Sequence, residues 1–403
     1  MSIIMNKVIT SIVPKQYIVP YLATTTLFFF WAFGLNANDI LVAHFKSLFG
    51  LNLLQASLVP TAYFTGYFLA SLPMGYVLDK IGFSKTIRLG LSLCTLGALG
   101  FIAAGFIGKY IVFLAALIIM ASGATALEVS ANSYVTLLGP EDKAGVRINF
   151  SQSFNALGAM VTVYGLAHLL LGSQSVMSIV RAYGTIAAVF FIAAILLNAR
   201  VIPDIHSSGV TSPNRSNAKI FSLNSFMGFL GILFYLGAQT TVASFLLIYA
   251  HRTLHITTLA AAIYVVMHVS LFLVGRFISS GILYFVRDSF LLGIYACINV
   301  LLCISAMTIY PIHPHAAVFS IVFMGAFNSI MYPTVFELTL RGQIRVRRVS
   351  SILVMGLVGG AISPPIMGEL ADLFSIQFAY IVPMVCYAMI LVCALYHIFF
   401  RRN

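Results

Sequence analysis

The sequence predicts an all-α integral membrane protein. Of its 403 residues, 61% are hydrophobic and only 8% are charged, and the mean hydropathy is +1.02. Charges this sparse cannot cover the surface of a water-soluble globule. The apolar segments are long enough for spanning helices, which need about 20 residues, whereas a membrane β-barrel would show short alternating segments. The 33 Phe and 30 Gly fit helices that pack through small residues and face lipid with large ones.

Charged and turn-rich points divide the chain into twelve apolar spans. They cover residues 17–43, 55–78, 86–107, 110–138, 150–171, 182–202, 223–250, 257–284, 289–310, 315–340, 349–371 and 377–400. Little more than Gly108-Lys109 separates the third span from the fourth. The first span is too long for the apolar region of a signal peptide, so we expect it to remain as a helix.

The basic residues predict the orientation of these spans, because Lys and Arg in short loops stay on the cytoplasmic side. With the amino terminus inside, cytoplasmic segments hold all of the 22 basic residues, Arg147 and Arg276 included, except Lys46, Lys109, Arg181 and Arg252. We therefore expect a multi-pass protein of the plasma or inner membrane with both termini in the cytoplasm. Anionic lipid is a sufficient partner for the net charge of +12, so no nucleic acid is implied.

A polar linker divides the twelve spans equally. Residues 203–222 contain five Ser, two Pro, two Asn and one Gly, and this polar segment leaves a six-helix half at 1–202 and another at 223–403. Two six-helix halves with both termini inside resemble the plan of the major facilitator transporters, whose halves rock about a site near the midplane of the membrane.

The loop between the second and third spans strengthens this resemblance. Residues 75–85 read Gly-Tyr-Val-Leu-Asp-Lys-Ile-Gly-Phe-Ser-Lys, which is similar to the signature loop of that superfamily. Physically, a glycine permits close helix approach or a tight turn, and Asp79 can pair with a helix end that must separate during rocking. The resemblance implies a gating loop made of Gly75, Asp79, Lys80, Gly82 and Lys85. In the second half only Gly275-Arg276 remains at the matching place.

Two isolated carboxylates are the strongest functional signal. Asp39 is the only charged side chain between Lys15 and Lys46, and Glu128 is the only one between Lys109 and Glu141. Each costs about 2.5 to 3.5 kcal/mol near a bilayer centre, and a structural acid would need a fixed cation that these spans lack. We therefore predict functional roles for both. Glu337, Glu369 and Asp372 lie near span ends and are expected to be interfacial.

Three predicted helices each carry two polar residues three or four positions apart, which places each pair on one face. The pairs are Asn36 with Asp39, Glu128 with Asn132, and Gln152 with Asn155. Their groups match the donors and acceptors of sugar hydroxyls, and Trp31, the only tryptophan, offers an aromatic face. Desolvation favours the neutral carboxyl, so a buried acid can take up and release a proton. The alternative is that the amides only join neighbouring helices.

Longer runs are similar to the fucose/proton symporter family, whose members carry fucose, glucose and galactose. The runs are Leu127–Tyr134, Leu138–Glu141, Asn149–Asn155, Gly237–Gln239, Phe327–Thr334 and Val358–Ala361. The resemblance implies that Asp39 and Glu128 couple protons and that the substrate is bound by Trp31, Asn36, Glu128, Asn132, Gln152, Asn155, Gln239 and Asn328. Val129 and Ser130 stand where the family usually has small residues, so the particular sugar stays open.

We thus expect a monomeric secondary transporter that imports a neutral hexose or 6-deoxyhexose with protons. Sodium coupling is an alternative, since carboxylates and amide oxygens suit a hard cation. A carrier of a different polar solute and a drug/proton antiporter also stay open, although the amide stripes argue against the antiporter. The sequence contains no phosphate loop and no metal or nucleophile motif, so we expect neither an enzyme nor a cofactor. The five cysteines are expected to be reduced packing residues.

Overall fold

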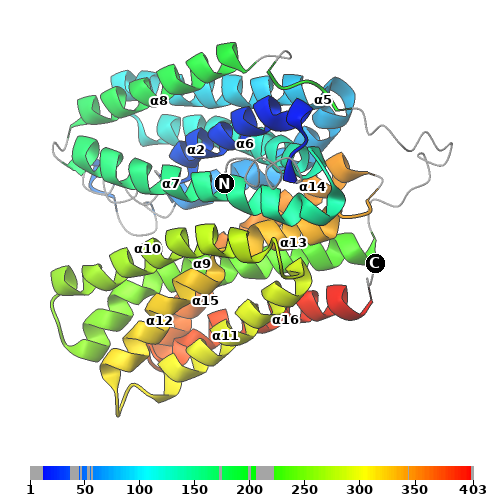
Figure 1. The fold of residues 1–403 in the computed structure, drawn as a ribbon. Helices are drawn as coiled ribbons and strands as arrows, with labels where there is room; N and C mark the ends of the chain where they lie inside the picture. Colours follow the sequence, from blue (N-terminus) through cyan, green and yellow to red (C-terminus); the bar gives the residue numbers. More distant parts are fainter. Residues whose placement is uncertain are drawn as a thin grey trace, which may run out of the picture. The chain divides into compact units, whose positions relative to one another are not determined.

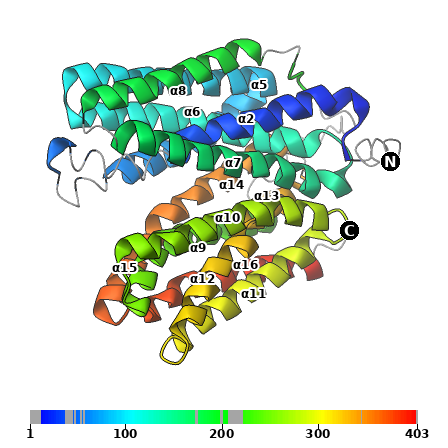
Figure 2. The same ribbon diagram turned by 60° about the vertical axis from the view of Figure 1, so that its left-hand side comes forward.

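A computed structural model shows a chain of helices (Figure 1, Figure 2). It describes residues 12–36, 45, 48–51, 55, 58–171, 175–197, 201–205, 222–343 and 345–400, and their side chains except at 33–36, 163–171 and 258–259. The first half of the sequence forms η1 (Lys15–Tyr17), α2 (Ile18–Asn36), α5 (Leu58–Ile107), α6 (Tyr110–Leu137), η2 (Glu141–Lys143), α7 (Ala144–Leu171) and α8 (Val176–Leu196). The second half forms α9 (Leu223–Leu254), α10 (Thr258–Ile282), α11 (Asp288–Thr308), α12 (Pro314–Asn328), α13 (Met331–Leu340), α14 (Val346–Met355), η4 (Gly356–Val358), α15 (Gly359–Leu373), η5 (Phe378–Tyr380) and α16 (Ile381–Phe399).

The described helices account for the twelve predicted spans. Nine of the described helical stretches are long and apolar enough to cross a membrane. One of them, α5, has 50 residues because it carries the second and third spans, with the non-helical Gly82 between them. α2 and α7 supply the first and fifth spans. α5 ends at Ile107 and α6 begins at Tyr110, which confirms the break predicted at Gly108-Lys109.

Two spans are interrupted, which the sequence analysis did not predict. The tenth span consists of α12 and α13, and the eleventh consists of α14, η4 and α15. Pro333 lies in the first turn of α13. Because proline has no N–H, it cannot bond the carbonyl four residues earlier, and the Ser329 carbonyl is left for another donor. Irregular backbone at membrane depth is stable only where protein groups satisfy such carbonyls.

The residue contacts divide the chain into two compact units. Unit 1 contains Met1–Arg147, Phe154–Ile220 and Gly342–Met355, and unit 2 contains Ile148–Ser153, Phe221–Arg341 and Gly356–Asn403. Most of each unit comes from one half of the sequence, but α14 packs with first-half helices and the start of α7 packs with second-half helices. The halves 1–202 and 223–403 with the linker 203–222 stay a prediction, and residues 206–221 lie outside the described part.

In unit 1, small residues bring α5 and α6 into backbone contact. A Cβ atom built on Gly90 would lie 2.9 Å from the Gly123 carbonyl oxygen, and one built on Gly123 would lie 2.7 Å from that of Gly90. α8 packs on α5, where the rings of Phe101 on α5 and Tyr183 on α8 stack with their centroids 3.8 Å apart. Van der Waals contact at this distance holds membrane helices together without a hydrophobic driving force.

In unit 2, α9 is the helix against which α10, α12, α13, α15 and α16 pack. Hydrogen bonds to main-chain carbonyls tie distant segments together. The Asn224 amide donates to the Thr339 carbonyl at 2.7 Å, and the Tyr249 hydroxyl donates to that of Ala306 at 2.5 Å. Each places a side-chain donor on a carbonyl near a helix end, where the helix itself supplies no N–H.

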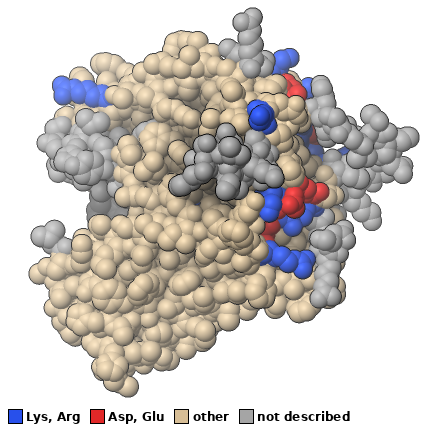
Figure 3. Space-filling model, viewed as in Figure 1, with Lys and Arg blue, Asp and Glu red and all other residues tan. Residues whose placement is uncertain are grey.

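The outer surface suits a lipid environment. Uncharged side chains form most of the face in Figure 3. Many of them are large and apolar, such as Phe106, which is 76% exposed near the end of α5. Lipid chains rather than water solvate such side chains, so their exposure costs nothing in a membrane.

The turn at Gly82 is held by an aspartate from a distant part of the sequence. Gly82 has φ 80° and ψ 178°, a conformation that almost only glycine adopts. A Cβ atom there would lie 2.4 Å from Oδ1 of Asp204, and this oxygen accepts hydrogen bonds from the N–H groups of Phe83 and Ser84. Asp204 therefore caps the helix that resumes after the turn.

We expect Gly82→Ala to destabilise the protein by about 1–3 kcal/mol, because alanine must adopt a glycine conformation and crowd Asp204. The measurement is the apparent thermal midpoint of purified protein in detergent at one scan rate. Gly281→Ala is the control, since a Cβ atom at Gly281 has open space around it. Equal midpoints for the two variants would contradict the strain assigned to Gly82.

Candidate functional site

Glu128 is buried in unit 1, as its isolation in the sequence predicts. Its side chain is 4% exposed on α6, and Asn132, one turn later, is fully buried. Four residues of separation place the two groups on one face of the helix. Main-chain hydrogen bonds already satisfy the hydroxyls that flank Asn132. Ser130 donates to the Ala126 carbonyl and Ser133 to the Val129 carbonyl, so both hydroxyl hydrogens are used within α6.

Tyr63 of α5 lies within electrostatic reach of Glu128, and the sequence analysis missed it and its neighbour Tyr67. Tyr63 is fully buried and close enough to Glu128 for their charges to interact. The Tyr63 hydroxyl also donates to the hydroxyl of Tyr67 at 3.4 Å, and the two rings lie 5.0 Å apart. Tyrosines four positions apart on one helix were the available signal. They give Glu128 a neighbouring hydroxyl that can donate or accept a proton.

Trp31, in the last third of α2, and Asn155, near the middle of α7, are also in unit 1. The Trp31 ring is 3% exposed and packs on Phe28 at 5.0 Å. Its Nε1–H is buried and has no hydrogen-bond partner among the described residues. The half-buried Asn155 donates from Nδ2 to the Phe28 carbonyl at 3.2 Å, which leaves its Oδ1 for another donor. Phe28 thus connects these two predicted substrate residues.

The other predicted substrate residues lie in unit 2. Gln152 is 3% exposed, and its main-chain carbonyl and its Oε1 both accept hydrogen bonds from Nη1 of Arg276, at 2.6 Å and 3.2 Å. Asn328 is fully buried, accepts a hydrogen bond from Asn299 at 3.1 Å and lies beside the Tyr387 hydroxyl. Gln239 is half-buried on α9.

Asp39, one of the two predicted proton-coupling residues, lies outside the described residues. Asn36 is the last residue of α2, but its side chain also lies outside the described part. The roles predicted for both stay predictions.

The predicted gating loop pairs with α14 inside unit 1. Asp79 forms an ion pair with Arg348, and the two side chains are 35% and 29% exposed. Lys80 and Arg348 both lie over the ring of Tyr76, at 4.4 Å and 4.8 Å from its centroid. Lys85 is exposed. Charge and cation–π contacts therefore hold α5, just before its turn at Gly82, against α14.

Three further contacts join α14 to α5 and α6. A Cβ atom on Gly75 would overlap the side chain of Ser351, so the glycine permits the close approach of the two helices. The hydroxyls of Ser133 on α6 and Ser350 on α14 hydrogen-bond at 2.6 Å. Arg347 lies over the Phe83 ring at 4.6 Å.

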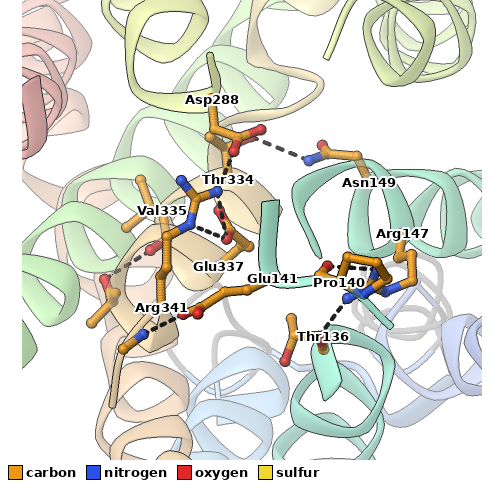
Figure 4. Close-up of polar contacts among 12 residues, drawn as sticks. Thr136, Pro140, Glu141, Arg147, Asn149, Asp288, Thr334, Val335, Glu337 and Arg341 are labelled. Atoms are coloured by element: carbon orange, nitrogen blue, oxygen red, sulfur yellow. Dashed lines mark hydrogen bonds and ion pairs between the residues drawn. The ribbon is translucent and has the colours of Figure 1, made fainter. Parts of the chain in front are cut away.

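Arg147 and Arg276, which the charge rule assigns to cytoplasmic segments, are buried, with 0% and 4% exposure. Arg147 donates to three main-chain carbonyls at the turn between α6 and α7 and to one at the start of the described chain, at 2.7–3.1 Å (Figure 4). The accepting residues are Ile12, Val135, Thr136 and Pro140. A guanidinium with five donors can serve several carbonyls that end a helix, and these would otherwise lie in a dry environment without a partner.

An ionic cluster in unit 2 corrects the interfacial position expected for Glu337. Glu337 is 1% exposed, and its Oε1 accepts a hydrogen bond from Nε of Arg341 at 2.8 Å (Figure 4). The same guanidinium pairs with Asp288 at the start of α11. Burial alone would lower the pKa of Arg341, but the two carboxylates outweigh it and raise that pKa. Beside this cluster, Asn149 of α7 donates to Thr334 at 3.3 Å.

The chain resembles known proteins along almost its whole length. The family model described as Major Facilitator Superfamily matches residues 22–342. A glucose/galactose transporter of Brucella abortus biovar 1 is 34% identical over 387 residues, which cover 93% of each chain. An L-fucose-proton symporter of Escherichia coli K12 is 32% identical over 94% of this chain and 93% of its own. The crystal structure of FucP in the outward conformation matches with a TM-score of 0.81 and 31% identity, over 96% of this chain and 100% of that one.

We expect Glu337→Gln to lower the apparent thermal midpoint, by an amount equivalent to about 1.5–3 kcal/mol, because Arg341 loses one of two charged partners in a buried setting. Asp142→Asn is the matched control. Asp142 pairs with Lys143 at 4.0 Å, but its side chain is 72% exposed, so water screens the pair. If both variants unfold at the same midpoint, the cluster contributes no more than a surface pair.

Proposed function

The chain belongs to the major facilitator superfamily, and on this premise we propose that it imports a neutral monosaccharide together with protons. The substrate class is a hexose or 6-deoxyhexose, such as fucose, glucose or galactose. As a member of this superfamily the chain is a multi-pass membrane transporter and not an enzyme. The pair of Glu128 and Asn132, buried on one face of α6, is the observation that carries the proposal.

The chemistry of this pair fits a sugar and a proton at one site. The carboxyl of Glu128 accepts hydrogen bonds when charged and also donates one when protonated, and the Asn132 amide does both. A sugar hydroxyl needs a donor and an acceptor, so it binds best where both are present. Tyr63 lies within electrostatic reach of Glu128. The Tyr63 hydroxyl is therefore a further group that can hydrogen-bond the Glu128 carboxyl or a sugar hydroxyl.

In the proposed cycle, Asp39 takes up the coupling proton and Glu128 contacts the sugar and shares the coupling. Protonation removes a charge that would otherwise oppose rocking within the membrane. Trp31 and Asn36 of α2, and Asn155 and Gln152 of α7, would bind the sugar with Glu128 and Asn132. Gln239 and Asn328 complete the set of residues to which the family resemblance assigns substrate binding.

The ion pair between Asp79 and Arg348 is proposed to act as a gate. Both side chains are partly exposed, so water can solvate the charges when they part and the energy to separate them is small. A pair of this kind closes one end of a transporter without locking it. The distribution of basic residues supports a cytoplasmic position for this end and for both termini.

The experiment that tests the function is uptake of a labelled sugar panel into vesicles containing the purified protein. A proton gradient, a sodium gradient or no gradient is imposed in parallel. Accumulation of a hexose or 6-deoxyhexose driven by the proton gradient alone is expected. Accumulation driven by the sodium gradient would show that sodium and not the proton is the coupling ion. Uptake of no sugar in the panel would overturn the substrate class.

We expect Asp39→Asn to abolish gradient-driven accumulation while sugar exchange or binding remains. The amide keeps its hydrogen bonds but cannot bind and release a proton. Counterflow of labelled sugar, measured beside uphill uptake, separates the two activities. Concentrative uptake at the wild-type level would remove Asp39 from the mechanism.

We expect the sugar affinity of the wild type to fall as pH rises through the range in which Glu128 loses its proton, because the protonated acid donates to a sugar hydroxyl. Glu128→Gln still donates, so its affinity should stay flat over the same range. Sugar binding to purified protein is measured against pH for both. Parallel profiles would show that Glu128 has no part in coupling.

A further inference from the structure

Arg276 is a cation buried inside the eighth span. Its guanidinium is surrounded by neutral groups of unit 2. Nε donates to the Ser329 carbonyl at 2.7 Å, and Nη1 donates to the carbonyl and the Oε1 of Gln152. The group lies over the Phe272 ring at 4.6 Å and within electrostatic reach of the Tyr235 hydroxyl. A membrane protein retains such a costly charge where it serves a function or an essential contact.

The break in the tenth span explains one of these contacts. Pro333 leaves the Ser329 carbonyl without its helical donor, and Arg276 supplies a replacement. This contact stays within second-half helices and fixes the position of the guanidinium. Nη1 of the planar guanidinium then faces α7, where the main-chain carbonyl and the Oε1 of Gln152 accept its hydrogen bonds.

Gln152 connects this charge to the substrate. It belongs to the polar stripe of α7 to which we assign sugar binding, and this step rests on the proposed function. The oxygen that would accept a hydrogen bond from a sugar hydroxyl is the same Oε1 that accepts one from Arg276. Because the partner is an amide and not a carboxylate, a sugar hydroxyl can compete for it.

We propose that Arg276 and Gln152 form a substrate-controlled latch between α10 and α7. When a sugar engages the Gln152 amide, Arg276 loses one of its acceptors, and the start of α7 separates from α10 and α13 more readily. Arg276 is a positioning residue in this scheme. It does not contact the sugar, but it makes separation depend on whether sugar is bound.

Thr334 provides a reporter for the separation. Its side chain is fully buried and accepts a hydrogen bond from Asn149 of α7, so it becomes accessible only when α7 moves away. Thr334→Cys is introduced together with Cys297→Ser, because Cys297 is the exposed cysteine and the other four are buried. The rate of labelling by a membrane-permeant maleimide then reports the open population.

Three variants in this background test the latch. Arg276→Lys keeps the charge but loses the fork, so sugar-free labelling should rise about tenfold. Gln152→Glu gives Arg276 a charged partner, so labelling should fall about tenfold and resist sugar. Gln152→Ala keeps the contact of Arg276 with the main-chain carbonyl but removes the Oε1 for which sugar and Arg276 compete. Saturating sugar should therefore no longer raise labelling. Arg181→Lys, at an exposed arginine, is the control.

If Arg276 only stabilises the fold, a different pattern of labelling is expected. Arg276→Lys would then lower the thermal midpoint, while saturating sugar would raise labelling by the same factor in the parent, Gln152→Ala and Gln152→Glu. That pattern overturns the latch. Sugar concentrations are scaled to the affinity of each variant, so that weaker binding is not taken for lost coupling.

The design separates this inference from the proposed function. Calorimetry of the parent, which carries only Thr334→Cys and Cys297→Ser, is done first with the sugar panel. Binding of no sugar overturns the proposed function. The sugar-free labelling rates of Arg276→Lys and Gln152→Glu still decide whether the contact closes α7 against α10. Unchanged rates in both would overturn the latch even in a protein that binds sugar.

Discussion

The architecture depends on how main-chain carbonyls are satisfied where helices end or break in a dry environment. An unpaired carbonyl in lipid costs several kcal/mol, so interruptions are stable only beside strong donors. Arg147 serves the turn between α6 and α7, and Arg276 serves the carbonyl that Pro333 releases. Arginine suits this task because one delocalised charge carries five donors in a fixed plane. The same property lets Arg276 bind a helix break on one side and a moving helix on the other.

Much of the fold follows from hydropathy, because spans are defined by length and composition alone. The break at Gly108-Lys109 and the turn at Gly82 were also predictable, since few residues other than glycine permit such turns. The interruptions of the tenth and eleventh spans were not predicted, although Pro333 was visible. Proline in a membrane helix is compatible with a kink or a break, and the choice depends on a donor such as Arg276 that lies 53 positions away in the sequence.

Some features of the candidate site could likewise be predicted from the sequence, and others could not. Burial of Glu128 and Asn132 was predictable, because the cost of an isolated acid in an apolar run is seldom met unless the acid is enclosed by protein and used. The burial of Arg147 and Arg276 could not be predicted from the charge rule, because that rule concerns the side of the membrane on which basic residues lie and not their packing. Tyr63 and Asp204 were missed since their significance comes from neighbours on other helices. Glu337 looked interfacial by position, but a guanidinium four residues later makes its burial possible.

The contribution of α14 to unit 1 has a consequence for biosynthesis. The ribosome delivers Asp79 and Ser133 to the membrane long before their partners Arg348 and Ser350 are made. Unit 1 is therefore incomplete until the chain has been synthesised to about Met355. Until then this face of α5 and α6 is open to insertion machinery or chaperones. A nascent chain that stalls within the second half would leave this face without the helix that covers it.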